Sequence, residues 1–528
     1  MWQRLSLYDL RVIGHYLGVL ILFTTIGLAA PLLTSIIFGE WQATERYFLT
    51  IGIFLIAGSA LRFLRIQPGR LSRQQAFAIT GLSWLVLAFF AALPLYWSGH
   101  YASYLDSLFE AVSGLTTTGA SVVQDLDHLS YSDNMWRFMM HLMGGLGLVV
   151  VGLSFGLFGK GGGASLFTSE GRSEHVVPNV VQTTQFIGRI CITFIAISTI
   201  SVGCISMTIG IEPARAFLQS FWVSISAFMT AGFVPMSQNI MYYHSISIEF
   251  ILVIVMLLGS INFTLHAEVI RGRVKAVFED TEVRYLVAWI VLIVIVLAAS
   301  LSGSRLFSNL PNIERRGLFM VFAALTTTGF QNVTTSQLAA GGFSSGAFLV
   351  LAILMAMGAS SGSTAGGIKI NRIAILSKSI VATLKETLAP DTARIVTSYN
   401  HIGRRPVTPD IVREATTVLI LYGVTYIIGA LAGIASGFEA SQAIFESVAM
   451  ASNGGITSGI VAPGMAWPLE LFYLFEMWAG RLEFVTLLAL LIQIVTSIMP
   501  SDLVGTMHAR NEERKRRSWT NVSSRYSH

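Results

Sequence analysis

The sequence predicts an all-α polytopic membrane protein made of four pseudo-symmetric helix–pore-loop–helix repeats around a central pore. Three observations lead to this fold class. The chain has 528 residues, of which 53% are hydrophobic and only 12% are charged, and this balance excludes an ordinary soluble domain. Apolar runs recur that are about as long as the twenty residues a bilayer core requires. The string Thr-Thr-Thr-Gly also occurs twice, and two degenerate copies complete a set of four, roughly a hundred residues apart.

The apolar runs predict about ten transmembrane helices. Two of them, near 12–38 and 47–64, precede the first repeat, and the first is too long for the apolar part of a signal peptide. Each repeat is then a long helix, a short half-buried segment, a small-residue loop and a second long helix. The first helices are expected near 75–98, 186–211, 284–303 and 411–436, and the second near 135–158, 247–270, 347–380 and 468–499.

These elements divide the chain into six parts: a two-helix extension at 1–70, pore repeats at 71–170, 171–275, 276–400 and 401–507, and a basic tail at 508–528. Basic residues follow every second span, so both termini are predicted to be cytoplasmic in a multi-pass protein of the cell (inner) membrane, in contact with membrane lipids. These loops account for the net charge of +5, and nucleic-acid binding is not expected. The opposite side holds Asp125, Asp127 and Asp133, a predicted acidic mouth suited to cations.

The four recurring loops occupy the same place in four longer windows, which open with an aromatic residue and end on glycine: Phe109–Gly119, Trp222–Gly232, Phe319–Gly329 and Phe445–Gly455. Such loops around one axis suit an ion selectivity filter, because inward carbonyl oxygens can replace the hydration shell of a cation and glycine tolerates the unusual φ angles. The alternative is a set of helix-packing loops. The candidate filter residues are Thr117, Thr118, Gly119, Thr230, Ala231, Gly232, Thr327, Thr328, Gly329, Asn453, Gly454 and Gly455.

A gate is predicted below this filter. The segment Gly358–Gly367 interrupts the second helix of the third repeat, and such a segment can plug a cavity and withdraw, although a close helix crossing would also explain it. Arg481 lies deep in an apolar helix, where an ionisable residue is a functional candidate; its alternative is a structural pair with Glu476 or Glu483. The candidate gate residues are Gly358, Gly362, Ser363, Thr364, Gly366, Gly367, Lys369 and Arg481.

Three further predictions concern buried polar groups. Glu110 and Glu446 hold equivalent places in the first and fourth half-helices and are expected to brace the filter loops from behind. His141 and His266 are expected to be buried packing residues rather than ion contacts. The sequence contains no Walker A string, no metal-spaced Cys/His cluster and no phosphorylated-Asp motif, so it does not predict an enzyme.

These features resemble the superfamily of potassium transporters that includes the bacterial Trk and Ktr membrane subunits and the plant and fungal high-affinity transporters. The resemblance covers nearly the whole chain, and the two extra N-terminal spans favour the TrkH type over the KtrB type. It rests on the four loop glycines and on the strings Gly358-Ala-Ser-Ser-Gly-Ser-Thr-Ala-Gly-Gly-Ile-Lys369, Met477-Trp-Ala-Gly-Arg481-Leu-Glu483 and Asn262-Phe-Thr-Leu-His266.

The resemblance implies potassium uptake, with one quarter of the filter from each repeat and potassium bound at the filter residues. Members with glycine at all four filter positions favour potassium, and this chain has all four. The fourth loop, Asn453–Gly455, departs from the Thr-rich pattern. The resemblance also implies that Gly358–Gly367 is an intramembrane gate and that Arg481 faces the pore below the filter and repels cations when the gate is closed.

For partners, the resemblance implies a homodimer and a cytosolic nucleotide-binding regulatory subunit of the TrkA type. No cofactor is expected in this chain, and K⁺ is the transported ion. Three rival functions stay open at this point. They are the channel-like subunit of a K⁺-pumping P-type ATPase, a symporter that couples K⁺ to H⁺ or Na⁺, and a non-transporting membrane scaffold.

Overall fold

The protein is described from a computed structural model, which describes residues 4–66, 71–147, 180–301, 313–333, 345–390, 396–401 and 403–498. These residues are mostly helical, which confirms the predicted all-α class. The strands among them are β1 (Ser398–Asn400) and β2 (Arg404–Pro406), which pair antiparallel. The predicted basic tail, 508–528, and the end of the second helix predicted for the first repeat lie outside the described residues.

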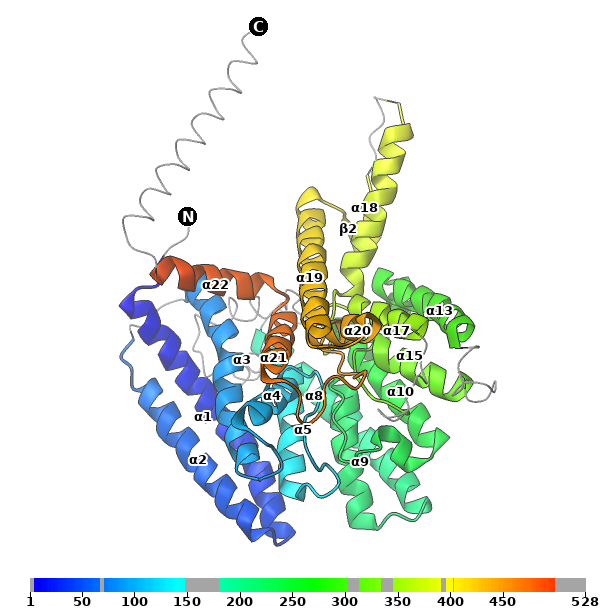
Figure 1. Ribbon diagram of the computed structural model, residues 1–528. Coiled ribbons are helices and arrows are strands. Elements are labelled where there is room, and N and C mark those ends of the chain that lie inside the picture. The colour runs from blue at the N-terminus through cyan, green and yellow to red at the C-terminus, as the bar shows by residue number, and fades with distance from the viewer. Residues whose placement is uncertain are drawn as a thin grey trace.

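The chain begins with two long helices packed against each other, α1 (Leu7–Ile37) and α2 (Trp41–Arg62). Ser6 caps the start of α1: its hydroxyl accepts a hydrogen bond from Asp9 N, while the Asp9 carboxylate accepts one from Ser6 N. This reciprocal capping gives hydrogen-bond acceptors to two backbone N–H groups that would otherwise have none at the start of the helix. Figure 1 shows the pair along one flank of the molecule, as the predicted N-terminal extension.

The first helix of each repeat is long and apolar, as predicted: α3 (Arg73–Tyr96), α8 (Val180–Thr208), α13 (Thr281–Leu301) and α19 (Pro409–Ala435). By length and composition, five helices of the described residues could each cross a membrane, or up to seven if each of two bent pairs is one span. Large apolar side chains are exposed on several of them, including Ile26, Ile56 and Ile420. Such surfaces suit contact with lipid rather than with water.

A short helix precedes each of the four loops: α4 (Tyr104–Leu115), α9 (Pro213–Phe228), η3 (Ile313–Gly317) with α15 (Leu318–Leu325), and α20 (Ala440–Ala451). Each ends where its loop begins, so the negative ends of the helix dipoles lie next to the four loops. The four helices are mostly buried and form the centre of the hydrophobic core.

The second helices are not continuous spans, which corrects the prediction for the second and fourth repeats. Helix α10 (Ile246–Ser260) bends by 101° into α11 (Phe263–Ile270), and α21 (Trp467–Arg481) bends by 114° into α22 (Val485–Ile498). Asn262 caps the start of α11, since its side chain accepts a hydrogen bond from Thr264 N. These two breaks carry no glycine run, so the sequence pattern did not reveal them.

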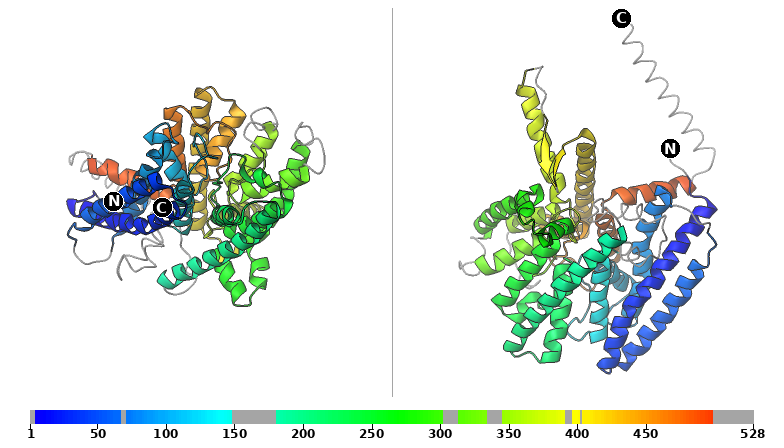
Figure 2. Two further views of the ribbon diagram at one scale, coloured as in Figure 1. Left: turned by 90° about the horizontal axis from the view of Figure 1, so that it is seen from below. Right: turned by 180° about the vertical axis from the view of Figure 1, so that it is seen from behind.

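In the third repeat the predicted interruption is present. Helix α17 (Ser345–Met357) ends before Gly358, and α18 (Ile370–Leu388) starts after Lys369, with irregular backbone between them. In the first repeat, α5 (Tyr131–Leu146) is followed by Gly147, which has a φ of +82°. Short helices η1 (Asn239–Tyr243) and α12 (Lys275–Glu279) complete the described elements. Figure 2 shows the repeats succeeding one another around the centre when the molecule is seen from below.

Candidate functional site

The four loops that follow the short helices share one backbone conformation. We number them loop 1 (Thr116–Gly119), loop 2 (Met229–Gly232), loop 3 (Thr326–Gly329) and loop 4 (Ser452–Gly455). The φ angle at the second position is +57° in Thr117, +50° in Thr230, +51° in Thr327 and +52° in Asn453, and at the fourth position +85° in Gly119, +88° in Gly232, +88° in Gly329 and +61° in Gly455. Left-handed φ is rare for Thr, so the repetition at one position in each loop indicates a shared structural requirement. Loop 4 keeps the conformation despite its different sequence.

The fourth-position glycines close the loops into a ring. A Cβ at Gly119 would overlap the Ala231 carbonyl of loop 2 and lie 2.6 Å from Gly232 Cα. Each of the other three glycines likewise faces a carbonyl oxygen of the adjacent loop: Gly232 faces Thr328 O, Gly329 faces Gly454 O, and Gly455 faces Thr118 O. The four loops therefore surround one axis in chain order, and only glycine fits at their contacts.

Glu110 braces loop 1 from behind with a fully buried ion pair. Its carboxylate accepts hydrogen bonds from Ser121 Oγ at 3.0 Å and Val122 N at 3.1 Å, just after the loop. Arg137 of α5 donates from Nε to the same carboxylate at 2.8 Å, and both side chains are 0% exposed. Arg137 also donates to Val234 O at 3.2 Å and stacks on Phe233, which ties loop 1 to the segment after loop 2.

Glu446 has the equivalent role in the fourth repeat without an arginine. Its carboxylate accepts hydrogen bonds from Thr457 Oγ1 at 2.8 Å, Ser458 N at 2.7 Å and Val461 N at 3.3 Å. Thr457 and Ser458 stand at the same distance from Glu446 along the chain as Ser121 and Val122 stand from Glu110. Both glutamates therefore have the contacts predicted for them.

Arg137 is absent from the site predicted from sequence, although it carries the same signal that identified Arg481: a guanidinium in an apolar helix. We predict that Arg137→Met lowers the free energy of unfolding by about 3–5 kcal/mol, because Glu110 would remain as an uncompensated buried charge. Thermal unfolding of the purified protein in detergent measures this as a lowered midpoint temperature.

A control variant, Arg413→Met, breaks the Arg413–Asp410 pair, whose side chains are 79% and 84% exposed. Such a surface pair contributes about 0–1 kcal/mol, so this variant should unfold near the wild-type temperature. The double variant Arg137→Met with Glu110→Gln should recover part of the loss, because it removes the orphaned charge. Equal midpoints for Arg137→Met and Arg413→Met would contradict a stabilising role for the buried pair.

The candidate gate residues lie directly beneath the loops and contact their second-position side chains. Gly366 N donates to Thr327 Oγ1 at 2.8 Å, and the Thr364 hydroxyl lies 3.1 Å from Thr230 Oγ1. Arg481 Nη1 donates to Thr117 Oγ1 at 3.2 Å. Three of the four second positions are therefore in hydrogen-bond contact with the predicted gate.

In loop 4 the second-position residue is Asn453, whose side chain forms hydrogen bonds with loop 1 and α21 instead of with the gate segment. Its Nδ2 donates to Thr118 Oγ1 of loop 1 and to Met477 O of α21, both at 2.9 Å. The gate segment still packs against it, since a Cβ at Gly366 would overlap Ser452 O and lie 3.1 Å from Asn453 Cβ. Asn453 thus links loops 4 and 1 where the other loops have threonine.

The gate segment is anchored to the break in the second repeat. Thr364 Oγ1 donates to Phe228 O at 3.1 Å and to Gly259 O at 3.0 Å. Phe263 N, which the break between α10 and α11 leaves without a helical acceptor, donates to Gly362 O at 3.4 Å. Ser360 N donates to Ser260 O at 3.2 Å. The two irregular segments therefore satisfy each other's backbone groups, as irregular backbone buried within a membrane protein requires.

Arg481 lies at the end of α21 and bridges three elements. Besides Thr117, its guanidinium donates to Thr364 O at 3.2 Å and to Gly144 O of α5 at 2.6 Å. The guanidinium carbon is 5.4 Å from the centre of the Trp84 ring. Beneath it is a cavity of about 50 Å³, lined by Trp84, Gly147, Gly362, Ser363, Ala365, Gly366, Gly367, Lys369, Asn453, Gly480, Arg481 and Glu483. A cavity of this size holds a few water molecules.

Of the remaining gate candidates, Lys369 borders this cavity and Gly358 packs against glycines that do. Lys369 is buried with a φ of +53°, and its ammonium donates to Ala365 O within the gate segment. Glu483 forms an ion pair with Arg372 at 2.5 Å. Gly358 packs against Gly366 and Gly367, because a Cβ there would lie 3.1 Å from Gly367 Cα. The structure thus brings all eight predicted gate residues to the space below loops 1–4.

The two histidines are packing residues, as predicted. His141 Nδ1 donates to Gly114 O at 2.9 Å, and its Nε2 accepts from Phe233 N at 3.3 Å. His266 Nε2 donates to Leu258 O at 2.9 Å. Both ring nitrogens of His141 and Nε2 of His266 therefore form hydrogen bonds with backbone groups.

The predicted acidic mouth is only partly formed. Asp133 is 1% exposed and forms an ion pair with Arg46 at 2.9 Å, so it contributes no open negative charge. Asp127 accepts hydrogen bonds from Ser237. Asp125 is exposed beside His128; their hydrogen bond raises the pKa of the imidazole and lowers the pKa of the carboxyl.

Comparisons with known proteins agree with this architecture. A family model described as TrkH, cation transport protein, matches residues 43–503. An uncharacterized cation transporter from Methanocaldococcus jannaschii is 29% identical over 493 residues, which are 92% of this chain and 96% of the relative. The Trk system potassium uptake protein TrkH of Escherichia coli is 27% identical over 496 residues, 91% of this chain and 98% of the relative.

Among solved structures, the crystal structure of the potassium transporter TrkH from Vibrio parahaemolyticus matches with a TM-score of 0.77 at 25% sequence identity. The match covers 91% of this chain and 98% of that chain. The family model spans all four loops, the gate segment and Arg481. The chain therefore belongs to the TrkH family of cation transport proteins.

Proposed function

We propose that this protein takes up potassium ions across the cell membrane through loops 1–4, which act as the selectivity filter. The observation that carries this proposal is the closed ring of four loops with the same left-handed residues at the second and fourth positions. This backbone pattern is suited to turning carbonyl oxygens toward one axis, where they replace the hydration shell of a cation. Relatives named as potassium uptake proteins support potassium as the ion. Membership in a family of cation transport proteins makes the chain a transporter and not an enzyme.

The gate in this proposal consists of the segment Gly358–Gly367 together with Arg481. The segment blocks the pathway directly below the filter, where it contacts the second-position side chains of loops 2 and 3. The Arg481 guanidinium contacts Thr117 at the inner end of loop 1 and repels a cation that leaves the filter. Opening requires the segment to withdraw toward the cytoplasm and these hydrogen bonds to break.

The proposal also covers the location, orientation and partners of the protein. The chain lies in the cell (inner) membrane with both termini in the cytoplasm, forms a homodimer, and docks a cytosolic nucleotide-binding regulatory subunit of the TrkA type. The membrane potential drives uptake, since moving one K⁺ inward gains about 2.3 kcal/mol per 100 mV. The names of relatives as parts of a Trk system support a multi-component assembly.

Ion flux through the purified chain in liposomes tests the transport function. We expect K⁺ flux to exceed Na⁺ flux by at least about tenfold, a difference of roughly 1.4 kcal/mol between the two barriers. The flux should follow only the K⁺ electrochemical gradient. Flux that reverses with an imposed H⁺ or Na⁺ gradient would instead establish a symporter. Flux that requires ATP and a catalytic partner subunit would establish the channel-like subunit of a pump.

A further inference from the structure

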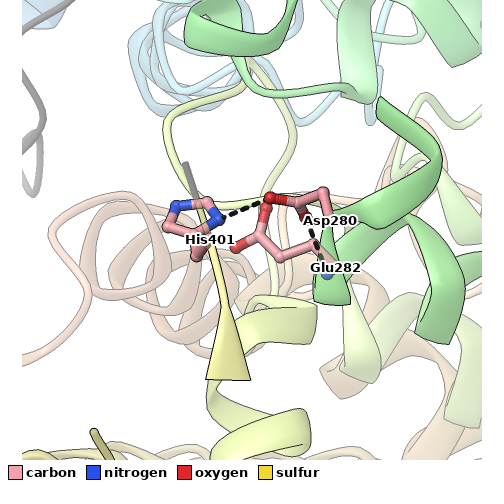
Figure 3. A group of neighbouring side chains, drawn as sticks. All are labelled: Asp280, Glu282 and His401. Atoms are coloured by element: carbon pink, nitrogen blue, oxygen red, sulfur yellow. Dashed lines mark hydrogen bonds and ion pairs between the residues drawn. The ribbon is translucent and has the colours of Figure 1, made fainter. Parts of the chain in front are cut away.

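Three buried side chains with metal-binding chemistry meet at the base of α13, outside the ion pathway. Asp280 and Glu282 flank the first residue of α13, and His401 lies in the turn between β1 and β2. All three are buried, and one ligand atom from each lies within 4.8 Å of the others. Figure 3 shows the three side chains pointing toward one another.

Rigid elements hold these side chains in place. Asp280 caps α13, since its Oδ1 accepts a hydrogen bond from Glu282 N at 2.8 Å, and this leaves Oδ2 to face His401 Nδ1 at 3.1 Å. The hairpin is fixed to the same helix end, because Asn400 N donates to Thr281 Oγ1 at 2.9 Å. A site built on a helix start and a hairpin needs little reorganisation to bind a ligand.

One carboxylate oxygen of the cluster has no partner. Glu282 is 0% exposed; its Oε1 accepts a hydrogen bond from Ser361 N at 3.2 Å, but its Oε2 has no hydrogen-bond partner. Burying a carboxyl oxygen without a hydrogen-bond partner is costly. Two carboxylates also outweigh the single positive charge that His401 can supply. A divalent cation between the three side chains would satisfy both the oxygen and the charge.

We propose that Asp280, Glu282 and His401 form a binding site for a divalent transition-metal ion of the zinc class. Imidazole nitrogen and carboxylate oxygens are ligands that suit Zn²⁺, whereas Mg²⁺ and Ca²⁺ prefer oxygen ligands alone. Three protein ligands leave a fourth position for water. Donor atoms around a tetrahedral Zn²⁺ with bonds of about 2.0–2.1 Å lie roughly 3.4 Å apart, so the side chains need to close inward slightly.

The site is connected to the candidate gate. Glu282 Oε1 accepts the hydrogen bond from Ser361 N, and Ser361 lies within the segment Gly358–Gly367. A bound ion would lock Glu282 to the hairpin and so stabilise the gate segment in its present position. This consequence rests on the proposed function, whereas metal binding itself does not.

Isothermal titration of the metal-free, purified full-length protein with Zn²⁺ tests the site. We expect one Zn²⁺ per chain in the wild type and at least tenfold weaker binding in Asp280→Asn and in His401→Ala. The control is His128→Ala, which removes an equivalent His–Asp pair whose side chains are 82% and 53% exposed. Absence of binding to the wild type, or equal binding by the wild type and His401→Ala, would overturn the proposal.

A spectroscopic variant separates coordination from a structural role. In His401→Cys, Co²⁺ bound at the site should gain a sulfur-to-cobalt charge-transfer band that the wild type lacks, because residue 401 would supply a thiolate ligand. His128→Cys should not gain it. Gel filtration confirms that each variant remains folded. A folded His401→Cys protein that binds Co²⁺ without this band would show that residue 401 is not a ligand and would overturn the site.

Flux in liposomes tests the connection to the gate separately. Zn²⁺ should lower K⁺ flux several-fold in the wild type and leave it unchanged in His401→Ala. Zn²⁺ binding without any change in flux would retain the metal site and overturn only its link to the gate. A chain that passes no K⁺ under any condition would count against the proposed function and leave the titration result standing.

Discussion

Gly119→Ser is expected to reduce the preference for K⁺ over Na⁺ flux by at least about tenfold. The residue has a φ of +85°, and a Cβ there would overlap Ala231 O and lie 2.6 Å from Gly232 Cα. Both atoms are backbone atoms of loop 2, so the ring must distort to admit a side chain. A distorted ring presents its carbonyl oxygens at altered positions, and a tenfold loss corresponds to about 1.4 kcal/mol of discrimination.

Gly99→Ser is the matched control for this variant. Gly99 has a similar φ of +78°, but a Cβ there meets nothing within 4 Å. It therefore isolates backbone strain from contact between loops, and its K⁺/Na⁺ flux ratio in liposomes should equal that of the wild type. Should Gly119→Ser keep the wild-type ratio while still passing ions, the assignment of the four loops as a filter fails.

Arg481→Ala is expected to raise K⁺ flux in the absence of any partner subunit by about tenfold or more. The guanidinium donates a hydrogen bond to Thr117 of loop 1, in the proposed filter, and two unit charges about 4 Å apart repel by roughly 4 kcal/mol at an effective dielectric constant of 20. The alanine variant also loses the hydrogen bonds to Thr364 O and Gly144 O that hold the gate segment to α5. Both effects favour passage, and flux measured in liposomes reports their sum.

Two further variants separate these effects. Arg481→Lys keeps the charge but loses the planar fork that reaches three acceptors, so its flux should lie between the wild type and Arg481→Ala. Arg413→Ala removes an exposed arginine at the start of α19 and should leave flux unchanged. A folded Arg481→Ala protein with wild-type or lower flux would remove this residue from the gate.

The broken second helices show what the sequence pattern reveals and what it does not. The interruption at Gly358–Gly367 is visible because several glycines stand in the middle of an apolar run, and glycine weakens a helix wherever it occurs. The breaks after Ser260 and Arg481 have no such local signal. They form because distant groups satisfy the freed backbone: Gly362 O accepts from Phe263 N, and the Tyr422 hydroxyl donates to Gly480 O.

For the buried charged residues, too, the sequence reveals that they exist, and only the structure reveals their contacts. Arg137 and Arg481 are visible in sequence as charges in apolar helices, but their different roles depend on their contacts: Arg137 pairs with Glu110 behind loop 1, whereas Arg481 faces the cavity. His401 and Asp280 are more than a hundred residues apart, so no spacing rule could join them. Only the docking of the hairpin on α13 brings the two side chains together.

The sequence by itself determined the membrane class, the four repeats, the glycines of the four loops and the depth of Arg481. These are local properties, because composition, hydrophobic length and the conformational freedom of glycine act within a few residues. Only the tertiary structure decided the order of the loops in the ring, the two helix breaks that no glycine run marks, the Glu110–Arg137 pair and the meeting of Asp280, Glu282 and His401. Each of these depends on polar groups far apart in the chain that must find partners in a core without water, and only the packed fold brings such partners together.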